Sequence, residues 1–252
     1  MAIMTLIRQF RIIVISKRKN KDCMSKAKIL PSNIEFLKLL KKNNNRDWFN
    51  DNKDRYTAEL NNIVAFADTL LAEMNKHDVI ETPTGKKSLF RIYRDTRFSN
   101  DKTPYKTVFS GSFTRASKQR RGGYYFHIEP GNSFVGGGFW GPEPADLKRV
   151  RDELAHNAAP LRKILKSKSF VNTFRTLQGE QVKTTPKGFD AANPAIDLIR
   201  YKQYLVMKKF TDKEVLSDDF LKKVNEAFKN MRPFFDYMSE VLTTDVNGIS
   251  II

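Results

Sequence analysis

Apolar residues after position 31 recur every three or four residues, which is the period of an α-helix that buries one face. The stretch Ser32-Asn33-Ile34-Glu35 has the sequence of a capping box and predicts the start of a first helix. After a turn rich in asparagine, a second and longer helix is predicted over residues 47–75. Its buried face is expected to contain Phe49, Tyr56, Leu60, Ile63, Ala67, Leu70, Leu71 and Met74.

The pattern changes after residue 87 to short stretches separated by Gly, Pro, Asn and basic turns, which predicts strands. Strands are expected over residues 88–94, 107–115, 123–129, 133–139 and 204–210. Close spacing favours antiparallel pairing. Further helices are predicted over 144–156, over 161–166 and from about 217 onward, where Pro233 is expected to kink or restart the helix. This order indicates an α+β fold, a mainly antiparallel sheet covered by helices in a single domain.

Residues 1–28 differ in composition from the rest of the chain, with eight basic side chains against one acidic residue. The longest uncharged run among them is too short to span a membrane, and no secretory signal pattern is present. The segment is either an arm for a membrane surface or a nucleic acid, or an upstream extension with Met24 as the natural start. The second interpretation is favoured, because everything recognisable follows Ile29. We therefore predict a disordered or misplaced extension over 1–28 and one α+β domain over 29–252.

The net charge and the small number of cysteines and histidines limit the kinds of partner and site that the sequence predicts. The net charge is +17, of which +7 comes from residues 1–28 and +10 from the remaining chain. This excess favours anionic partners, although a basic protein that contacts no nucleic acid has the same composition. The single cysteine, Cys23, and three widely spaced histidines predict no disulfide, no thiolate zinc site and a cytoplasmic location. No metal or cofactor is predicted, and no pattern predicts a membrane partner or an oligomeric state.

Residues 91–106 carry the densest chemistry in the chain. Five cations, two acids and two tyrosines occupy these sixteen positions; they are Arg91, Tyr93, Arg94, Asp95, Arg97, Asp101, Lys102, Tyr105 and Lys106. Arginine presents a planar fork that suits phosphate or carboxylate oxygens, and the two aspartates can hold such forks in place. The alternative is a network of ion pairs that ties a long loop to the sheet. The surplus of cations favours an anion-binding role.

The same stretch resembles a known family. Its pattern Arg91-x-x-Arg94-Asp95-x-Arg97-Phe98, followed by Asp101-Lys102-x-x-Tyr105, is similar to the signature of a bacterial and fungal family catalogued as domain of unknown function 2461. Further similar stretches are Asn44-Asn45-Arg46-Asp47-Trp48-Phe49, Tyr124-Tyr125-x-His127-Ile128-Glu129-Pro130-Gly131, Gly136-Gly137-Gly138-x-Trp140 and Pro186-Lys187-Gly188-Phe189. The resemblance covers about Ile29 to Leu242. It implies a shared fold and a shared site, and it implies no particular reaction.

A second candidate site lies in the predicted strand 123–129. Strand alternation places Tyr125, His127 and Glu129 on one face, where His127 and Glu129 can act as a general base and the group that orients it. A histidine bonded to a neighbouring strand for structure is the alternative. The glycines at 136–138 allow a backbone, a bulky side chain such as Trp140, or a ligand to approach the sheet closely.

Three functions follow from these features. The first is a domain that binds a phosphate- or carboxylate-bearing ligand, such as a nucleotide or phosphometabolite, through the arginine-rich segment, with His127, Glu129 and Trp140 nearby. The second is a hydrolase or transferase that acts on an anionic substrate with His127 as base. The third is non-specific nucleic-acid binding, which would depend steeply on salt. The sequence leaves open whether the protein is an enzyme.

Overall fold

Four strands and a set of helices make up residues 27–245 and 248–251, which the computed structural model describes. The strands are β1 (Phe109–Thr114), β2 (Gly123–Ile128), β3 (Ser133–Phe139) and β4 (Tyr204–Phe210). The helices are α2 (Pro31–Lys42), α3 (Arg46–Asp51), α4 (Lys53–Met74), α5 (Gly85–Ser88), α6 (Pro144–His156), α7 (Ala159–Leu165), α8 (Lys168–Phe174), α9 (Ile196–Ile199), α10 (Asp212–Val215) and α11 (Phe220–Thr243). The predicted α+β fold is confirmed.

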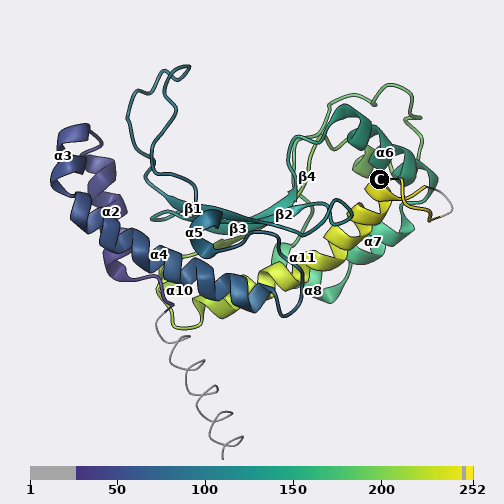
Figure 1. Cartoon of the computed structure of the whole chain (residues 1–252). Helices are drawn as coiled ribbons and strands as arrows, with labels where there is room; N and C mark the ends of the chain where they lie inside the picture. Colours follow the sequence, from purple (N-terminus) through teal and green to yellow (C-terminus); the bar gives the residue numbers. More distant parts are fainter. Residues whose placement is uncertain (1–26, 246–247, 252) are drawn as a thin grey trace, which may run out of the picture.

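The sheet is antiparallel throughout, with strand order β1-β2-β3-β4. One of its faces packs against α4 and α11, which cross beneath it in Figure 1. From β2, Tyr124, Phe126 and Ile128 enter this core because alternate residues of a strand point to the same face. Phe66 of α4 contacts Phe126 at a ring-centroid distance of 6.0 Å, and Phe228 of α11 contacts Tyr124 at 5.0 Å. The buried aromatic rings therefore fix how the two long helices lie on the sheet.

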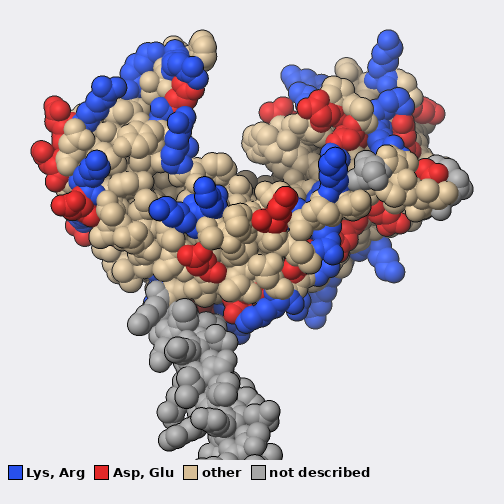
Figure 2. Space-filling model, viewed as in Figure 1, with Lys and Arg blue, Asp and Glu red and all other residues tan. Residues whose placement is uncertain are grey.

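The opposite face of the sheet is not covered by α4 or α11. Two groups of elements rise along its sides, with α2, α3 and the loop at 90–108 on one side and α6 on the other, while α7 and α8 lie alongside α11 (Figure 1). The space-filling view shows the resulting hollow, with Lys and Arg side chains on the wall that carries the loop (Figure 2). The fold therefore combines one packed face of the sheet with one concave face.

Local structure departs from the predictions where tertiary contacts replace regular pairing. The predicted strand 88–94 is instead the end of α5 followed by a loop with single bridges from Leu89 to Gly111 and from Tyr93 to Tyr105. The helix predicted over 47–75 is interrupted at Asn52, whose backbone and side-chain nitrogens both donate to the Trp48 carbonyl. Pro233 lies within a continuous α11.

The beginning of the described chain is already part of the core. Ala27 and Ile29 are buried, and Lys28 pairs with Asp218 at 2.6 Å. The predicted extension falls almost entirely on residues 1–26, outside the described residues. Among the residues that the structure describes, no helix combines the length and the apolar character needed to cross a membrane.

Candidate functional site

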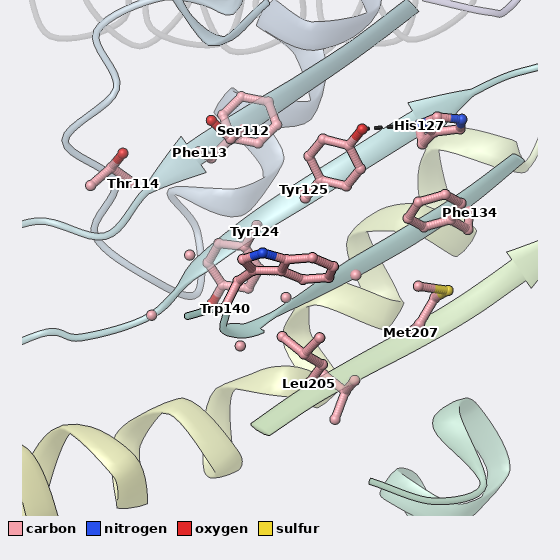
Figure 3. Close-up of a pocket in the computed structure, with 16 residues that line it drawn as sticks. Ser112, Phe113, Thr114, Tyr124, Tyr125, His127, Phe134, Trp140, Leu205 and Met207 are labelled. Atoms are coloured by element: carbon pink, nitrogen blue, oxygen red, sulfur yellow. Dashed lines mark hydrogen bonds between the residues drawn. The ribbon is translucent and has the colours of Figure 1, made fainter. Parts of the chain in front are cut away.

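The concave face of the sheet forms a cleft with a volume of about 590 Å³. Its central row follows the strand register, in which Tyr125 lies between Ser112 of β1 and Gly136 of β3, and Gly136 pairs in turn with Met207 of β4. Figure 3 shows further lining residues, which include His127, Phe134, Trp140 and Leu205. Among the described residues that line the cleft, none is Lys, Arg, Asp or Glu. The floor is therefore suited to an uncharged, flat group.

The glycines of β3 are explained by tight packing around the strand. A Cβ on Gly137 would lie 2.6 Å from the Phe235 ring, and one on Gly138 would lie 2.2 Å from the Tyr204 carbonyl oxygen. The sequence interpretation had named Trp140 as the bulky neighbour, whereas the structure places Phe235 and the β4 backbone there. Because Gly136 has no side chain, the cleft beside Tyr125 stays open on the β3 side.

Trp140 follows β3 directly and lies at the cleft with 76% of its surface exposed. In Figure 3 its indole projects over β3. An exposed aromatic ring at the edge of an apolar cleft is typical of sites that stack a ligand ring. The second tryptophan of the chain, Trp48, is instead partly buried against the core, 6.0 Å from Phe36. Trp140 is therefore the tryptophan that can report on events in the cleft.

A chain of hydrogen bonds runs along one side of the cleft from Tyr125 through His127 to Glu129. The Tyr125 hydroxyl lies 3.0 Å from His127 Nδ1, and His127 Nε2 lies 3.0 Å from Glu129 Oε2. Although burial by itself raises the pKa of Glu129, bonds from His127 and Asn132 hold that pKa below its usual value. Burial raises the pKa of Tyr125, so its hydroxyl stays protonated near neutral pH. The predicted pairing of His127 with Glu129 is thus present, and Tyr125 extends it.

The arginine-rich segment forms a loop that closes on itself. Its neck is held by backbone bonds from Arg94 N to the Pro104 carbonyl and from Lys106 N to the Ile92 carbonyl, 2.9 and 2.7 Å long. Tyr105 anchors the neck because its buried ring stacks on Phe49 with centroids 4.0 Å apart. Tyr105 therefore supports the loop from the core, while Tyr93 next to it is half exposed.

Both aspartates of this loop pair with arginines of the same loop. Arg94 pairs with Asp101 at 2.5 Å, and Arg97 with Asp95 at 2.7 Å. Bonds from Arg97 hold the pKa of Asp95 below its usual value, and bonds from Thr103 and Arg94 do the same for Asp101. Lys102 donates to the Thr96 carbonyl at 3.0 Å. Ion pairs of the kind expected for the structural alternative are therefore present, but these pairs close the loop on itself and do not tie it to the sheet.

Three cations of the loop, Arg91, Lys102 and Lys106, stand outside these pairs, and Lys102 is held instead by the Thr96 carbonyl. Within the described chain, neither Arg91 nor Lys106 has a carboxylate within 4.0 Å. Lys106 lies over the Phe90 ring at 5.7 Å, and Phe90 lies 6.2 Å from the Tyr125 ring of the cleft. The base of the loop thus adjoins the cleft, whereas the loop arginines do not line it. At the tip, Phe98 is 97% exposed beside Arg97.

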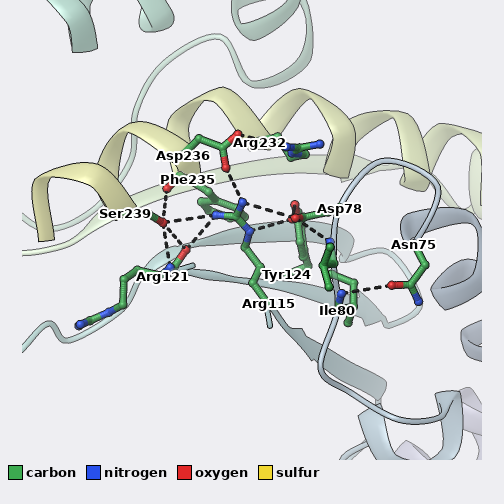
Figure 4. Close-up of polar contacts among 11 residues, drawn as sticks. Asn75, Asp78, Ile80, Arg115, Arg121, Tyr124, Arg232, Phe235, Asp236 and Ser239 are labelled. Carbon is green, nitrogen blue, oxygen red and sulfur yellow. Dashed lines mark hydrogen bonds and ion pairs between the residues drawn. The ribbon is translucent and has the colours of Figure 1, made fainter. Parts of the chain in front are cut away.

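A second arginine cluster, which the sequence analysis missed, lies on the packed side of the sheet (Figure 4). Arg115 donates to Asp78 at 2.7 Å and also bonds to Asp236, while Tyr124 donates to Asp78 at 2.7 Å. The guanidinium lies over the Phe235 ring at 5.7 Å. The only signal in the sequence was a charged residue at the end of a predicted buried strand. This cluster joins the segment after α4 to the sheet and to α11.

The comparisons with known proteins agree with the resemblance of the motifs. The family model described as "Conserved hypothetical protein (DUF2461)" matches residues 32–237, most of the chain. The protein belongs to the DUF2461 family. No curated protein and no solved structure matches the chain.

Three of the five stretches that resemble the DUF2461 signature fall in two neighbouring places. The pattern from Arg91 to Tyr105 makes the basic loop, and the stretches that contain His127 and Trp140 make β2, β3 and the cleft. The later Pro186–Phe189 stretch is a turn in which Gly188 has φ +88°, a conformation that favours glycine. The family pattern in this chain is therefore concentrated at the cleft and on the loop beside it.

Proposed function

We propose that this DUF2461 protein binds a nucleotide or another phosphate- or carboxylate-bearing metabolite that also carries a ring. The ring stacks in the cleft against Trp140, and the anionic group meets the cations at the base of the loop. The observation that carries this proposal is an uncharged cleft with an exposed tryptophan, next to which Lys106 lies over the Phe90 ring that contacts Tyr125 of the cleft.

The cleft supports the ring portion of the ligand. Flat apolar pockets with a few polar groups at their edge are the usual sites for small ligands. Here Trp140, Tyr125 and Phe134 supply aromatic surface, and the Tyr125 hydroxyl and the His127 ring supply the polar edge. A nucleobase fits this description because it has two flat faces and a polar rim.

Arg91 and Lys106 support the anionic portion. A cation without a carboxylate partner gains more from a ligand phosphate than one whose charge is already neutralised. Arg94 and Arg97 are each held by an aspartate, so we assign them to shaping the loop and its field. This division refines the expectation that all of the loop arginines contact the ligand directly.

Tryptophan fluorescence tests the proposal. In a Trp48→Phe background, Trp140 is the only remaining tryptophan, so titration with ATP, GMP, ribose 5-phosphate and inorganic phosphate reads the cleft directly. We expect saturable quenching by nucleotides and a rise in thermal stability of about 2.7 kcal/mol at a hundredfold excess over Kd. Arg91→Ala should weaken binding, whereas Lys229→Ala on the exposed side of α11 should not. Absence of quenching and stabilisation by every anion would refute the proposal.

Nucleic-acid binding is separated from this proposal by salt. A protein that neutralises several phosphates loses affinity by orders of magnitude over a few-fold rise in salt, whereas a single pocket ligand depends on salt weakly. A short single-stranded oligonucleotide is therefore titrated alongside the nucleotides at two salt concentrations. A steep loss of oligonucleotide affinity at the higher salt concentration, without quenching by any mononucleotide, would favour the nucleic-acid alternative.

A further inference from the structure

The hydrogen bonds along β2 define which atom holds each proton. The Glu129 carboxylate at neutral pH can only accept, so His127 Nε2 must donate to it across 3.0 Å. In a neutral imidazole the other nitrogen, Nδ1, then carries a lone pair. The Tyr125 hydroxyl, 3.0 Å from Nδ1, therefore donates its proton to His127. The direction of the chain is from the tyrosine to the carboxylate.

The imidazole in this chain is held on every side. Its two nitrogens are both engaged, and its ring stacks on Phe134 with centroids 4.6 Å apart and planes 18° from parallel. Glu129 is fixed in turn by Asn132, which donates to the same carboxylate oxygen at 2.8 Å. His127 is thus placed to accept a proton from Tyr125 and has no free nitrogen for a ligand. In this arrangement the group that faces a substrate is the Tyr125 hydroxyl, and His127 lies behind it as the base.

Tyr125 is the member of the chain with room beside it. It lies opposite Gly136 in the register of β2 and β3, and this glycine places no side chain over the cleft. The arrangement of hydroxyl, imidazole and carboxylate has the order of a hydroxyl nucleophile with its base and an orienting acid. Such a chain removes the hydroxyl proton during attack, so the tyrosine need not ionise beforehand.

We propose that Tyr125 is a nucleophile toward the phosphorus of a phosphate ester whose ring occupies the cleft and whose phosphate lies at the polar edge of the cleft, with His127 accepting the Tyr125 proton and Glu129 holding the resulting imidazolium. Tyr125 Oη forms the new bond to phosphorus, the bond to the leaving alcohol oxygen breaks, and the His127 proton passes to that oxygen. Water then attacks the tyrosyl phosphate and releases phosphate, which restores the hydroxyl. The choice of a phosphate ester rests on the proposed anionic ligand, whereas the proton chain does not.

Labelling with diisopropyl fluorophosphate tests the nucleophile without a known substrate. Tyr125 Oη attacks phosphorus, fluoride leaves as the anion, and the tyrosine proton passes to His127 and then to water, so bond formation and proton removal match the proposed first step. Peptide mass spectrometry compares labelling of Tyr125 with that of Tyr93, which is half exposed and outside the chain. We expect Tyr125 to react faster than Tyr93 by on the order of a hundredfold, the contribution of a positioned base.

Three variants show whether the rate comes from the proton chain. Tyr125→Phe should remove the label, and His127→Gln and Glu129→Gln should bring Tyr125 towards the Tyr93 rate while thermal unfolding shows an intact fold. Equal labelling of Tyr125 and Tyr93 in the unchanged protein, or full labelling of Tyr125 in both glutamine variants, would overturn the inference. Quenching by nucleotides without labelling would leave the binding proposal standing alone. Labelling of Tyr125 without quenching would refute nucleotide binding and would still support the activated tyrosine.

Discussion

The two arginine clusters of this protein lie in opposite environments. In the basic loop, Arg97 is 77% exposed and pairs with Asp95 two residues away. In the core, Arg115 and Asp78 are each 1% exposed and come from segments separated by 37 residues. Both clusters are made of arginine and aspartate at hydrogen-bonding distance, yet only the first was visible in the sequence.

The environment decides what each cluster does. An exposed ion pair gains little because water solvates both partners well and the side chains lose freedom. A buried pair is different: removal of one partner leaves an uncompensated charge in a medium that solvates it poorly. The Arg115 guanidinium also donates to the Arg121 carbonyl at 3.2 Å, so several elements depend on it. We infer that the buried cluster stabilises the fold, whereas the exposed loop keeps cations available at the cleft.

The largest effect is expected for Arg115→Met. The change leaves Asp78 buried without its main cation and should lower the free energy of unfolding by about 3–5 kcal/mol, measured by urea denaturation. The double variant with Asp78→Asn should lose less than the two single losses added together, because the charges act as a pair. A loss below about 1 kcal/mol for Arg115→Met would put the cluster in the same class as surface ion pairs.

Tyr124→Phe should have the next largest effect. It removes the 2.7 Å hydrogen bond to Asp78 and keeps the ring that packs against Phe228. A hydrogen bond to a charged group contributes about 1.5–3 kcal/mol, so the loss should be smaller than for Arg115→Met. Equilibrium denaturation measures the loss, with Tyr201→Phe as a control, because the Tyr201 hydroxyl donates to the neutral Leu177 carbonyl and not to a carboxylate. Equal losses of unfolding free energy in the two variants would show that the bond to the Asp78 carboxylate stabilises the fold no more than a bond to a neutral carbonyl.

Acid should weaken the buried cluster with a defined sign. Burial alone raises the pKa of Asp78, but hydrogen bonds from Tyr124 and Arg115 outweigh this and hold its pKa below the usual value. A carboxyl with a lowered pKa in the folded state stabilises the protein above its unfolded pKa of about 3.9 and loses that contribution as pH falls through the folded value. The midpoint of urea unfolding, followed from pH 6 to pH 3, should therefore fall less steeply in Asp78→Asn than in the unchanged protein. Parallel curves would contradict the assignment.

The smallest effect on stability is expected in the basic loop. Arg97→Ala breaks a pair that is exposed to solvent, so thermal unfolding should not change measurably. Arg94→Ala should lower stability slightly more, because Arg94 also donates to the carbonyl and hydroxyl of Thr103 across the loop. Both variants should weaken the affinity for the nucleotide, measured by Trp140 quenching, while thermal unfolding changes little. A loss of stability comparable to that of Tyr124→Phe would make the loop network structural after all.

Much of the secondary structure could be predicted because the period of apolar residues along the chain is a local property of the sequence. The bounds of α6, β3 and β4 agree with the predicted 144–156, 133–139 and 204–210, since each has a regular pattern and a clear turn on both sides. The predicted strand over 88–94 was wrong. The alternation of aromatic residues there is typical of a strand, whereas only single bridges form. The short helices α8 to α10 were not predicted, because their few turns are held by packing rather than by periodicity.

The candidate site was predicted in its parts and not in its arrangement. Local sequence was enough to mark the arginines of 91–106, to place His127 and Glu129 on one strand face, and to assign the family, since these depend on neighbouring residues. The tertiary structure decided that the base of the loop lies beside the cleft and that Arg115 meets Asp78. The physical reason is that hydrogen bonds and burial depend on distance in space. Pairs such as Arg115 and Asp236, which are 121 residues apart, leave no local pattern in the chain.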